Sequence, residues 1–189
     1  MDCITLLTAD HNRVRGLFSQ FSEAHEHEDR ETMAEVAGKI ATELEVHTSI
    51  EEEIFYPWVR TQSDELAETV DEGMEEHHEV KVLLAEVASL EPGDPAWVAK
   101  LTVITENVAH HAEEEESEMF PKLRTATTAG ERDEMGAQLD ARKGQLGAPV
   151  LADTIDLTDR ELHELATAQA IPGRSSMDHN ELAATVNPA

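Results

Sequence analysis

Cysteine and aromatic residues are scarce in this sequence. Cys3 is the only cysteine among 189 residues, so no intrachain disulfide can form and a reducing, cytoplasmic location is expected. Phe, Trp and Tyr make up 4% of the chain, which leaves Leu, Val, Ile, Met and Ala to build the core. The first residues lack a basic stretch followed by a long apolar run, so we expect neither a signal peptide nor a membrane span.

Basic residues are also few. The chain has 14 Lys and Arg residues against 41 Asp and Glu residues, a formal net charge of -27. Such a surface repels the phosphates of nucleic acids and of anionic membranes, so neither is expected as a partner. Excess acid by itself indicates only a well-solvated surface. Carboxylates indicate a metal site when they stand at ligand spacing on a buried face.

Alternating runs of β-branched residues are nearly absent, whereas Ala, Leu and Glu are abundant, which predicts an all-α protein. Apolar residues recur at intervals of three and four over residues 4–25, 30–58, 63–90 and 95–124. These four segments predict an up-down-up-down four-helix bundle. A fifth helix is predicted over residues 130–146.

The end of the bundle is marked by Gly144, Gly147 and Pro149. We therefore predict one domain over residues 1–147 and, over residues 148–189, a linker followed by a small helical unit. Thr158 and Glu161 have the spacing of a capping box at the start of its first helix. A second short helix is predicted over residues 177–184.

One motif, His-x3-Glu-x5-Pro, occurs twice, beginning at His47 and at His111. Its His and Glu lie four residues apart and therefore share one helix face. A leading histidine precedes each copy: His11 precedes the first and His77 the second. Similar residues flank these two leading histidines. The bundle is thus an internal duplication in outline, and its two halves would supply four imidazoles and two carboxylates.

These side chains fall on the apolar stripes of four different helices. A buried His or Glu costs several kcal/mol unless it is paired or binds a metal. For a single His a hydrogen-bonded core position is the better interpretation, but four histidines with two matching carboxylates favour a metal site. The midpoints between successive histidines fall in polar or helix-breaking segments near Asp29, Gln62 and Asp94, which puts all four histidines at one level of the bundle. The predicted metal ligands are His11, His47, Glu51, His77, His111 and Glu115.

Two neighbouring registers also fit the spacing. His110 and Glu114 form a His-x3-Glu pair, and His78 adjoins His77. Neighbouring side chains on a helix diverge by about 100°, so both members of such a pair cannot point inward. The pair beginning at His111 keeps the same distance to its proline as the first motif does. His78 and His110 are interpreted either as hydrogen-bond donors to the ligands or as exposed residues.

This order of ligands resembles the hemerythrin-like (HHE cation-binding) family over about residues 4–146. The resemblance implies a four-helix bundle with two iron ions, bridged by oxygen and by two carboxylates, here Glu51 and Glu115. Oxygen carriers of that family have H-x3-H in the third helix and H-x4-D in the fourth. This chain has Lys81 in place of the second histidine and closes with H-x3-E, from His111 to Glu115. The chain is more similar to the H-HxxxE-H-HxxxE branch, for which peroxide and nitric oxide chemistry is discussed.

Ferritin-like bundles need E-x2-H on two helices, and a zinc hydrolase needs three ligands; neither pattern fits.

Four histidines divide into about two per iron, which leaves roughly one open coordination place on each metal. Adjacent open places favour a small oxidant that bridges both metals. We therefore expect an oxidoreductase-like di-iron protein that decomposes hydrogen peroxide, as a catalase does, or detoxifies nitric oxide and peroxide under oxidative stress. The alternative is a module that binds or senses oxygen or iron without turnover, so whether the chain is an enzyme stays open.

Tyr56 is the only tyrosine. It stands one residue before Pro57, where the second motif has Phe120, and that match favours core packing. As a candidate catalytic residue, its phenol would donate a hydrogen bond near the irons or replace the missing fifth histidine. Both interpretations stay open.

The C-terminal residues resemble a Rho N-terminal/SAP-like helix-loop-helix around Glu161, Ile171 and Leu182. Modules of that kind can bind nucleic acid. Here Asp178, His179 and Asn180 stand where a basic residue is expected, so docking to a protein partner is the preferred interpretation.

Overall fold

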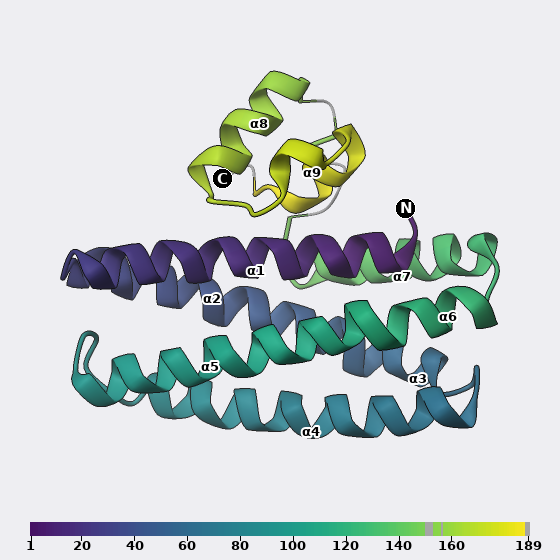
Figure 1. The fold of residues 1–189 in the computed structure, drawn as a ribbon, viewed down its shortest axis with the longest axis horizontal. Coiled ribbons are helices and arrows are strands. Elements are labelled where there is room, and N and C mark those ends of the chain that lie inside the picture. The colour runs from purple at the N-terminus through teal and green to yellow at the C-terminus, as the bar shows by residue number, and fades with distance from the viewer. Residues whose placement is uncertain (150–152, 156, 188–189) are drawn as a thin grey trace.

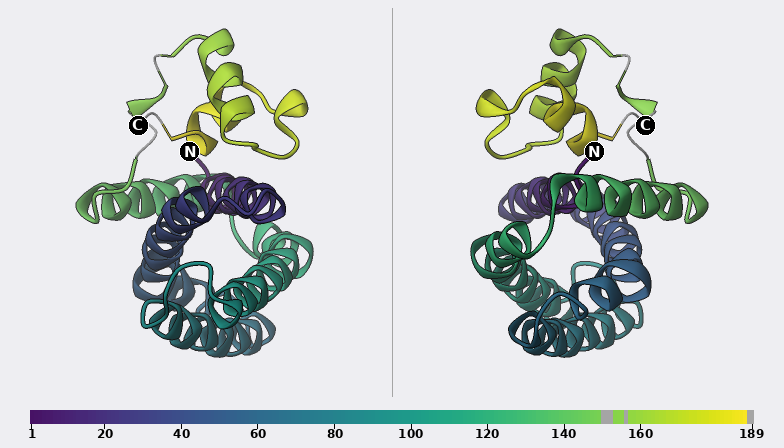
Figure 2. Two further views of the ribbon diagram at one scale, coloured as in Figure 1. Left: turned by 90° about the vertical axis from the view of Figure 1, so that its left-hand side faces the viewer. Right: turned by 90° about the vertical axis from the view of Figure 1, so that its right-hand side faces the viewer.

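Four long antiparallel helices form a ring around a common interior (Figures 1 and 2). The computed structural model describes residues 1–149, 153–155 and 157–187. The ring consists of α1 (Cys3–Glu26), α2 (Arg30–Ile50), α4 (Asp64–Val87) and α5 (Pro95–Glu114). No strand occurs among the described residues. The predicted all-α bundle is confirmed.

Local signals explain where these helices begin. The side chains of Asp2, Asp29 and Ser63 accept hydrogen bonds from the backbone at the starts of α1, α2 and α4, and such caps satisfy amides that the helix leaves unpaired. Pro95 starts α5, at a position where its missing N–H costs nothing. Short connections then turn each helix back along its predecessor.

Two of the long helices contain a π-helical turn at the same place in the repeat. Helix α2 continues through η1 (Glu51–Phe55) into α3 (Tyr56–Val59), and α5 continues through η2 (Glu115–Met119) into α6 (Phe120–Ala126). A proline is the second residue of each following helix. Proline lacks an N–H and its ring clashes with the preceding helical turn, and a widened turn accommodates it.

Each π turn shifts the inward face by one residue. Regular helical spacing places Ile54 and Trp58 on the inward stripe, but both are only partly buried, whereas Phe55 and Val59 are 0% exposed. One extra residue in the turn moves every following side chain by about 100°. The same shift brings Tyr56 and Phe120 to the bundle interior.

Helix α7 (Ala129–Gln145) lies outside the ring beside α1 (Figure 2). A capping box between Thr128 and Glu131 starts it. Its Met135 and Leu139 belong to the same core cluster as Leu7 and Leu123 of the bundle. The packing of α7 therefore closes one end of the bundle core.

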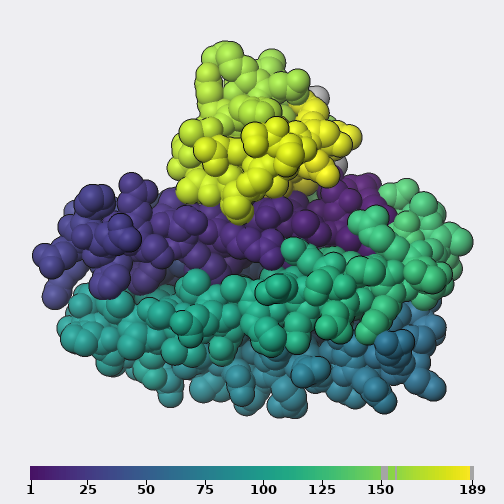
Figure 3. All heavy atoms as spheres, viewed as in Figure 1, coloured from purple at the N-terminus to yellow at the C-terminus, as the bar shows by residue number. Residues whose placement is uncertain are grey.

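The C-terminal unit, residues 153–155 and 157–187, sits on the outer face of α1 (Figures 1 and 3). It contains α8 (Asp159–Ala168), the short η4 (Arg174–Ser176) and α9 (His179–Thr185). The expected capping box of Thr158 and Glu161 is present. Its own apolar cluster consists of Leu162, Ala166, Ile171, Leu182, Ala183 and Val186.

The linker predicted from residue 148 includes residues 150–152, which lie outside the described part of the chain. The division into domains at residues 147 and 148 stays a prediction. Among the described residues, no helix combines the length and the apolar character needed to cross a bilayer.

We expect Leu139→Ala to destabilise the whole bundle, because Leu139 is fully buried between α7 and the bundle core. Truncation of such a side chain lowers the free energy of unfolding by about 2–5 kcal/mol. Urea unfolding followed by circular dichroism measures the change. Val82→Ala, at an exposed position of α4, should stay within about 0.5 kcal/mol of wild type. A similarly small effect of Leu139→Ala would show that α7 does not contribute to the core.

Candidate metal centre

The helices bring all six predicted ligands together inside the ring. His11 lies on α1 and His77 on α4, whereas each His-x3-Glu pair spans the junction between a long helix and its π turn. None of the six is more than 6% exposed. The structure therefore buries His111 and Glu115, whereas their neighbour His110 is exposed.

The Nε2 atoms of the histidines point toward the two carboxylates. Glu51 Oε2 lies 3.2 Å from His47 Nε2 and 3.3 Å from His77 Nε2. Glu115 Oε2 lies 3.3 Å from His11 Nε2, and its Oε1 lies 3.9 Å from His111 Nε2. Imidazole nitrogens and carboxylate oxygens thus gather around one small volume, where His77 Nε2 also lies 3.1 Å from His111 Nε2.

These atoms form two groups suited to metal ions, with the ligand atoms of each group within 4.8 Å of one another. The first group consists of His11, His47, Glu51 and Glu115, and the second of Glu51, His77 and His111. Glu51 belongs to both groups, which is the place of a bridging ligand. Glu115 belongs only to the first, although the family resemblance implies that it bridges as well. The set of His11, His47, Glu51 and Glu115 is the first metal group, and the set of Glu51, His77 and His111 is the second metal group.

Several buried atoms at this site have no hydrogen-bond partner. An unsatisfied buried polar atom costs about 1–3 kcal/mol, and a cation in each group would give these lone pairs a partner. The ligand residues therefore fit a metal centre. The atoms concerned at the ligands are His11 Nε2, both ring nitrogens of His47, both oxygens of Glu51, and Glu115 Oε2.

The electrostatics of Glu51 and His77 agree with this interpretation. Burial and the negative charge of Glu115 raise the pKa of Glu51 well above its usual range, because two close carboxylates resist ionising together in a dry interior. Burial, reinforced by the neighbouring His111, lowers the pKa of His77 to about 2. A neutral imidazole has the lone pair that a metal needs, and a bound cation would favour the ionised form of Glu51.

On the outer side, each of the four histidines faces a carboxylate through its Nδ1 atom. Glu116 lies 2.8 Å from His11, Glu52 lies 3.1 Å from His77, and Glu76 lies 2.7 Å from His111. Asp10 faces His47 at 3.7 Å. The three carboxylates within hydrogen-bond distance fix the ring orientation and keep the proton on Nδ1, so that Nε2 is free to bind a metal.

These four outer carboxylates follow the duplication, and sequence reasoning missed them. Asp10 and Glu76 directly precede the leading histidines, and Glu52 and Glu116 directly follow the ligand glutamates. The signal was therefore present as an acidic residue at the same place in each repeat. In a chain this acidic, that signal could not be distinguished from the solvated surface.

The comparison with known families rests on this same region. The hemerythrin HHE cation binding domain matches residues 2–123. The chain belongs to the hemerythrin HHE family. A DNA nickase from Nostoc sp. (strain PCC 7120 / SAG 25.82 / UTEX 2576) is 26% identical over 146 residues, which cover 77% of this chain and 40% of the nickase. No solved structure matches the chain significantly.

Lys81 occupies the position where oxygen-carrying hemerythrins are expected to have a further histidine. Its side chain is 44% exposed and forms an ion pair with Glu52 at 2.6 Å, and Glu52 in turn faces His77 Nδ1. Lys81 therefore contacts this HHE centre only indirectly, through the carboxylate of Glu52, and it is not among the candidate metal ligands. His78, which was a candidate hydrogen-bond donor to the ligands, is exposed.

Tyr56 reaches the centre of this HHE domain directly. Its hydroxyl donates a hydrogen bond of 3.0 Å to Glu115 Oε1 and lies 3.4 Å from the Nε2 atoms of both His77 and His111. The phenol therefore stands beside the second metal group, in contact with a carboxylate of the first. Burial and the charge of Glu115 raise its pKa well above the usual value, so the hydroxyl keeps its proton.

The register of the fourth helix can be tested by metal content. We expect Glu115→Ala to reduce the metal bound per chain, because Glu115 is buried in the first metal group. Glu114→Ala removes a partly exposed carboxylate that pairs with the exposed His110 and should leave the content near wild type. Elemental analysis of the two purified variants gives the answer, and the opposite order would assign the ligands to His110 and Glu114.

Proposed function

We propose that this hemerythrin HHE protein holds two irons and uses them to decompose hydrogen peroxide, with nitric oxide as a second small reactant. The observation that carries the proposal is the pair of buried metal groups that share Glu51. Each group contains two imidazoles and at least one carboxylate, a nitrogen and oxygen donor set that suits non-haem iron. When bound at these two groups, iron would supply redox chemistry to a small oxidant.

Burial of the site limits the substrate to small molecules. The six ligands are at most 6% exposed, so a polymer or a large metabolite would have to open the bundle to reach them. Peroxide, nitric oxide and oxygen are small enough to pass between side chains. This limit supports a small oxidant as the reactant and leaves the choice among the three to experiment.

The residues around the centre have separate tasks in this proposal. The outer carboxylates hold the imidazole rings and keep their Nε2 atoms available. Tyr56 holds Oε1 of Glu115 through its hydroxyl proton, and its oxygen lies 3.4 Å from the Nε2 atoms of His77 and His111 in the second metal group. Thus the chain contributes orientation, a proton at Tyr56 and exclusion of water.

The sensing alternative is favoured by one contact. The buried Arg13, two residues from His11, hydrogen-bonds the C-terminal unit at Thr185, so a change at the centre could reach that unit and then a protein partner. DNA nicking, the activity named for the Nostoc relative, receives less support here. A net charge of -27 opposes contact with the DNA backbone.

Metal analysis and turnover together test the proposal. We expect about two irons per chain, near-ultraviolet charge-transfer absorption and steady oxygen release from hydrogen peroxide. Iron-free protein prepared with a chelator is the control and should release none. Iron-loaded protein that binds peroxide or oxygen without consuming it would support the sensing alternative. A folded, functional protein free of iron would contradict both.

Tyr56→Phe separates a chemical role from core packing. The change removes one hydrogen bond to a charged group, worth about 1.5–3 kcal/mol, and keeps the aromatic ring. We expect unchanged iron content and peroxide turnover slower by about 10-fold or more, measured as oxygen release. Trp58→Phe, at a partly buried position outside both metal groups, should leave turnover unchanged. Equal rates for both variants would reduce Tyr56 to a packing residue.

A further inference from the structure

One of the four contacts between a histidine and its outer carboxylate is open. Three of the Nδ1 atoms lie 2.7–3.1 Å from their carboxylates, whereas His47 Nδ1 lies 3.7 Å from Asp10 Oδ2. Neither His47 Nδ1 nor Asp10 Oδ2 has a hydrogen-bond partner. Both side chains are buried, so the gap leaves two polar atoms unsatisfied although a small rotation would join them.

Two cations hold Asp10 by its other oxygen. Lys143 of α7 and Arg13 of α1 both donate to Oδ1, the latter at 3.3 Å. Asp10, Arg13 and Lys143 are each at most 4% exposed, and charge attraction is strong in such a dry environment. These two contacts fix Oδ1 beside Lys143 and Arg13 and leave Oδ2 3.7 Å from His47 Nδ1.

Arg13 is also the main polar anchor of the C-terminal unit. Its Nε donates to the carbonyl of Thr185 at 2.9 Å, and its Nη2 donates to the carbonyl of Ala184 at 2.6 Å. Both carbonyls stand at the end of α9, where a helix leaves acceptors unpaired and a basic side chain binds well. One guanidinium therefore joins the C-terminal unit to the residue that faces His47.

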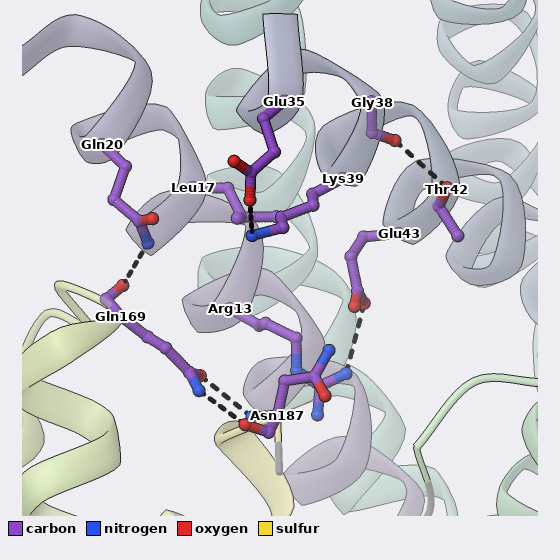
Figure 4. Close-up of a pocket in the computed structure, with 10 residues that line it drawn as sticks. All are labelled: Arg13, Leu17, Gln20, Glu35, Gly38, Lys39, Thr42, Glu43, Gln169 and Asn187. Atoms are coloured by element: carbon purple, nitrogen blue, oxygen red, sulfur yellow. Dashed lines mark hydrogen bonds and ion pairs between the residues drawn. The ribbon is translucent and has the colours of Figure 1, made fainter. Parts of the chain in front are cut away.

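The rest of this docking contact is a narrow strip along α1. A Cβ atom on Gly16 would stand 2.5 Å from the carbonyl oxygen of Gln169, so only glycine permits this approach. Gln20 donates to the same carbonyl at 2.9 Å (Figure 4). Beside the strip, a pocket of about 510 Å³ separates α2 from the C-terminal unit. Docking thus depends on Arg13, Gly16 and Gln20.

We propose that the docked C-terminal unit lowers the metal affinity of the first metal group by holding Asp10 away from His47 through Arg13. When the unit leaves α1, Arg13 loses both carbonyl acceptors and can turn toward Glu43, which already lies 3.2 Å from its Nη1. Asp10 is then held by Lys143 alone and can rotate to hydrogen-bond His47 Nδ1, which makes the imidazole a better ligand. The second metal group has no such link, because its histidines face Glu52 and Glu76. The inference rests on the metal binding in the proposed function and adds a regulator to it.

Gly16→Ala tests this coupling without touching a ligand or the bundle interior. The added methyl group would clash with the backbone of the C-terminal unit. Gly38→Ala on α2 is the matched control, since a Cβ there meets nothing within 4 Å. Anaerobic titration with Co²⁺, read from its visible absorption against a competing chelator, gives the affinity of each site. Hydrogen exchange of the amides in α9 reports whether the unit is docked.

We expect Gly16→Ala to speed exchange in α9 and to tighten one of two Co²⁺ sites by about 10-fold, the lower end of effects known for such outer partners. Arg13→Gln removes the guanidinium that holds Asp10 and should tighten the same Co²⁺ site without a steric clash. Gly38→Ala should have the Co²⁺ affinities and the α9 exchange of wild type. Unchanged Co²⁺ affinities in Gly16→Ala and Arg13→Gln would overturn the coupling. Unchanged hydrogen exchange of α9 in Gly16→Ala would show that the contact at Gly16 does not hold the C-terminal unit on α1. A wild-type chain that binds no Co²⁺ would overturn the metal centre itself.

Discussion

The free energy of burying six ionisable side chains in one dry interior constrains the rest of this structure. Two carboxylates stand beside four imidazoles, and several of their atoms have no hydrogen-bond partner. Such an arrangement costs free energy in a metal-free protein, and it becomes favourable when each group binds a cation. Membership of the hemerythrin HHE family agrees with this physical reading.

The duplication of the chain makes the centre nearly symmetric, and its outer contacts break that symmetry. In both halves an acidic residue faces each histidine, so the two halves supply matching sets of side chains. Lys81 and Arg15 then bind the carboxylates that face His77 and His11, whereas Lys143 and Arg13 draw Asp10 away from His47. Surface and interdomain charges can therefore tune the two metals separately.

Regular helical spacing also misleads where the backbone departs from it. Each motif ends in a proline, and the π turn before that proline rotates the following residues inward by one place. This rotation buries Phe55 in place of Ile54 and brings the Tyr56 hydroxyl to Glu115. A one-residue insertion leaves no mark on a hydrophobic pattern, because the stripe on either side of it is still helical.

By itself the sequence determined the four helices, their antiparallel order and the convergence of the four histidines and two glutamates, because apolar periodicity and hairpin geometry act over short stretches of chain. Only the tertiary structure decided that Glu51 is shared by both metal groups, that Tyr56 contacts Glu115, and that Arg13 joins α9 to Asp10. These relations unite residues far apart in the chain. They depend on side-chain direction and on the docking of one helix against another, which no local pattern specifies.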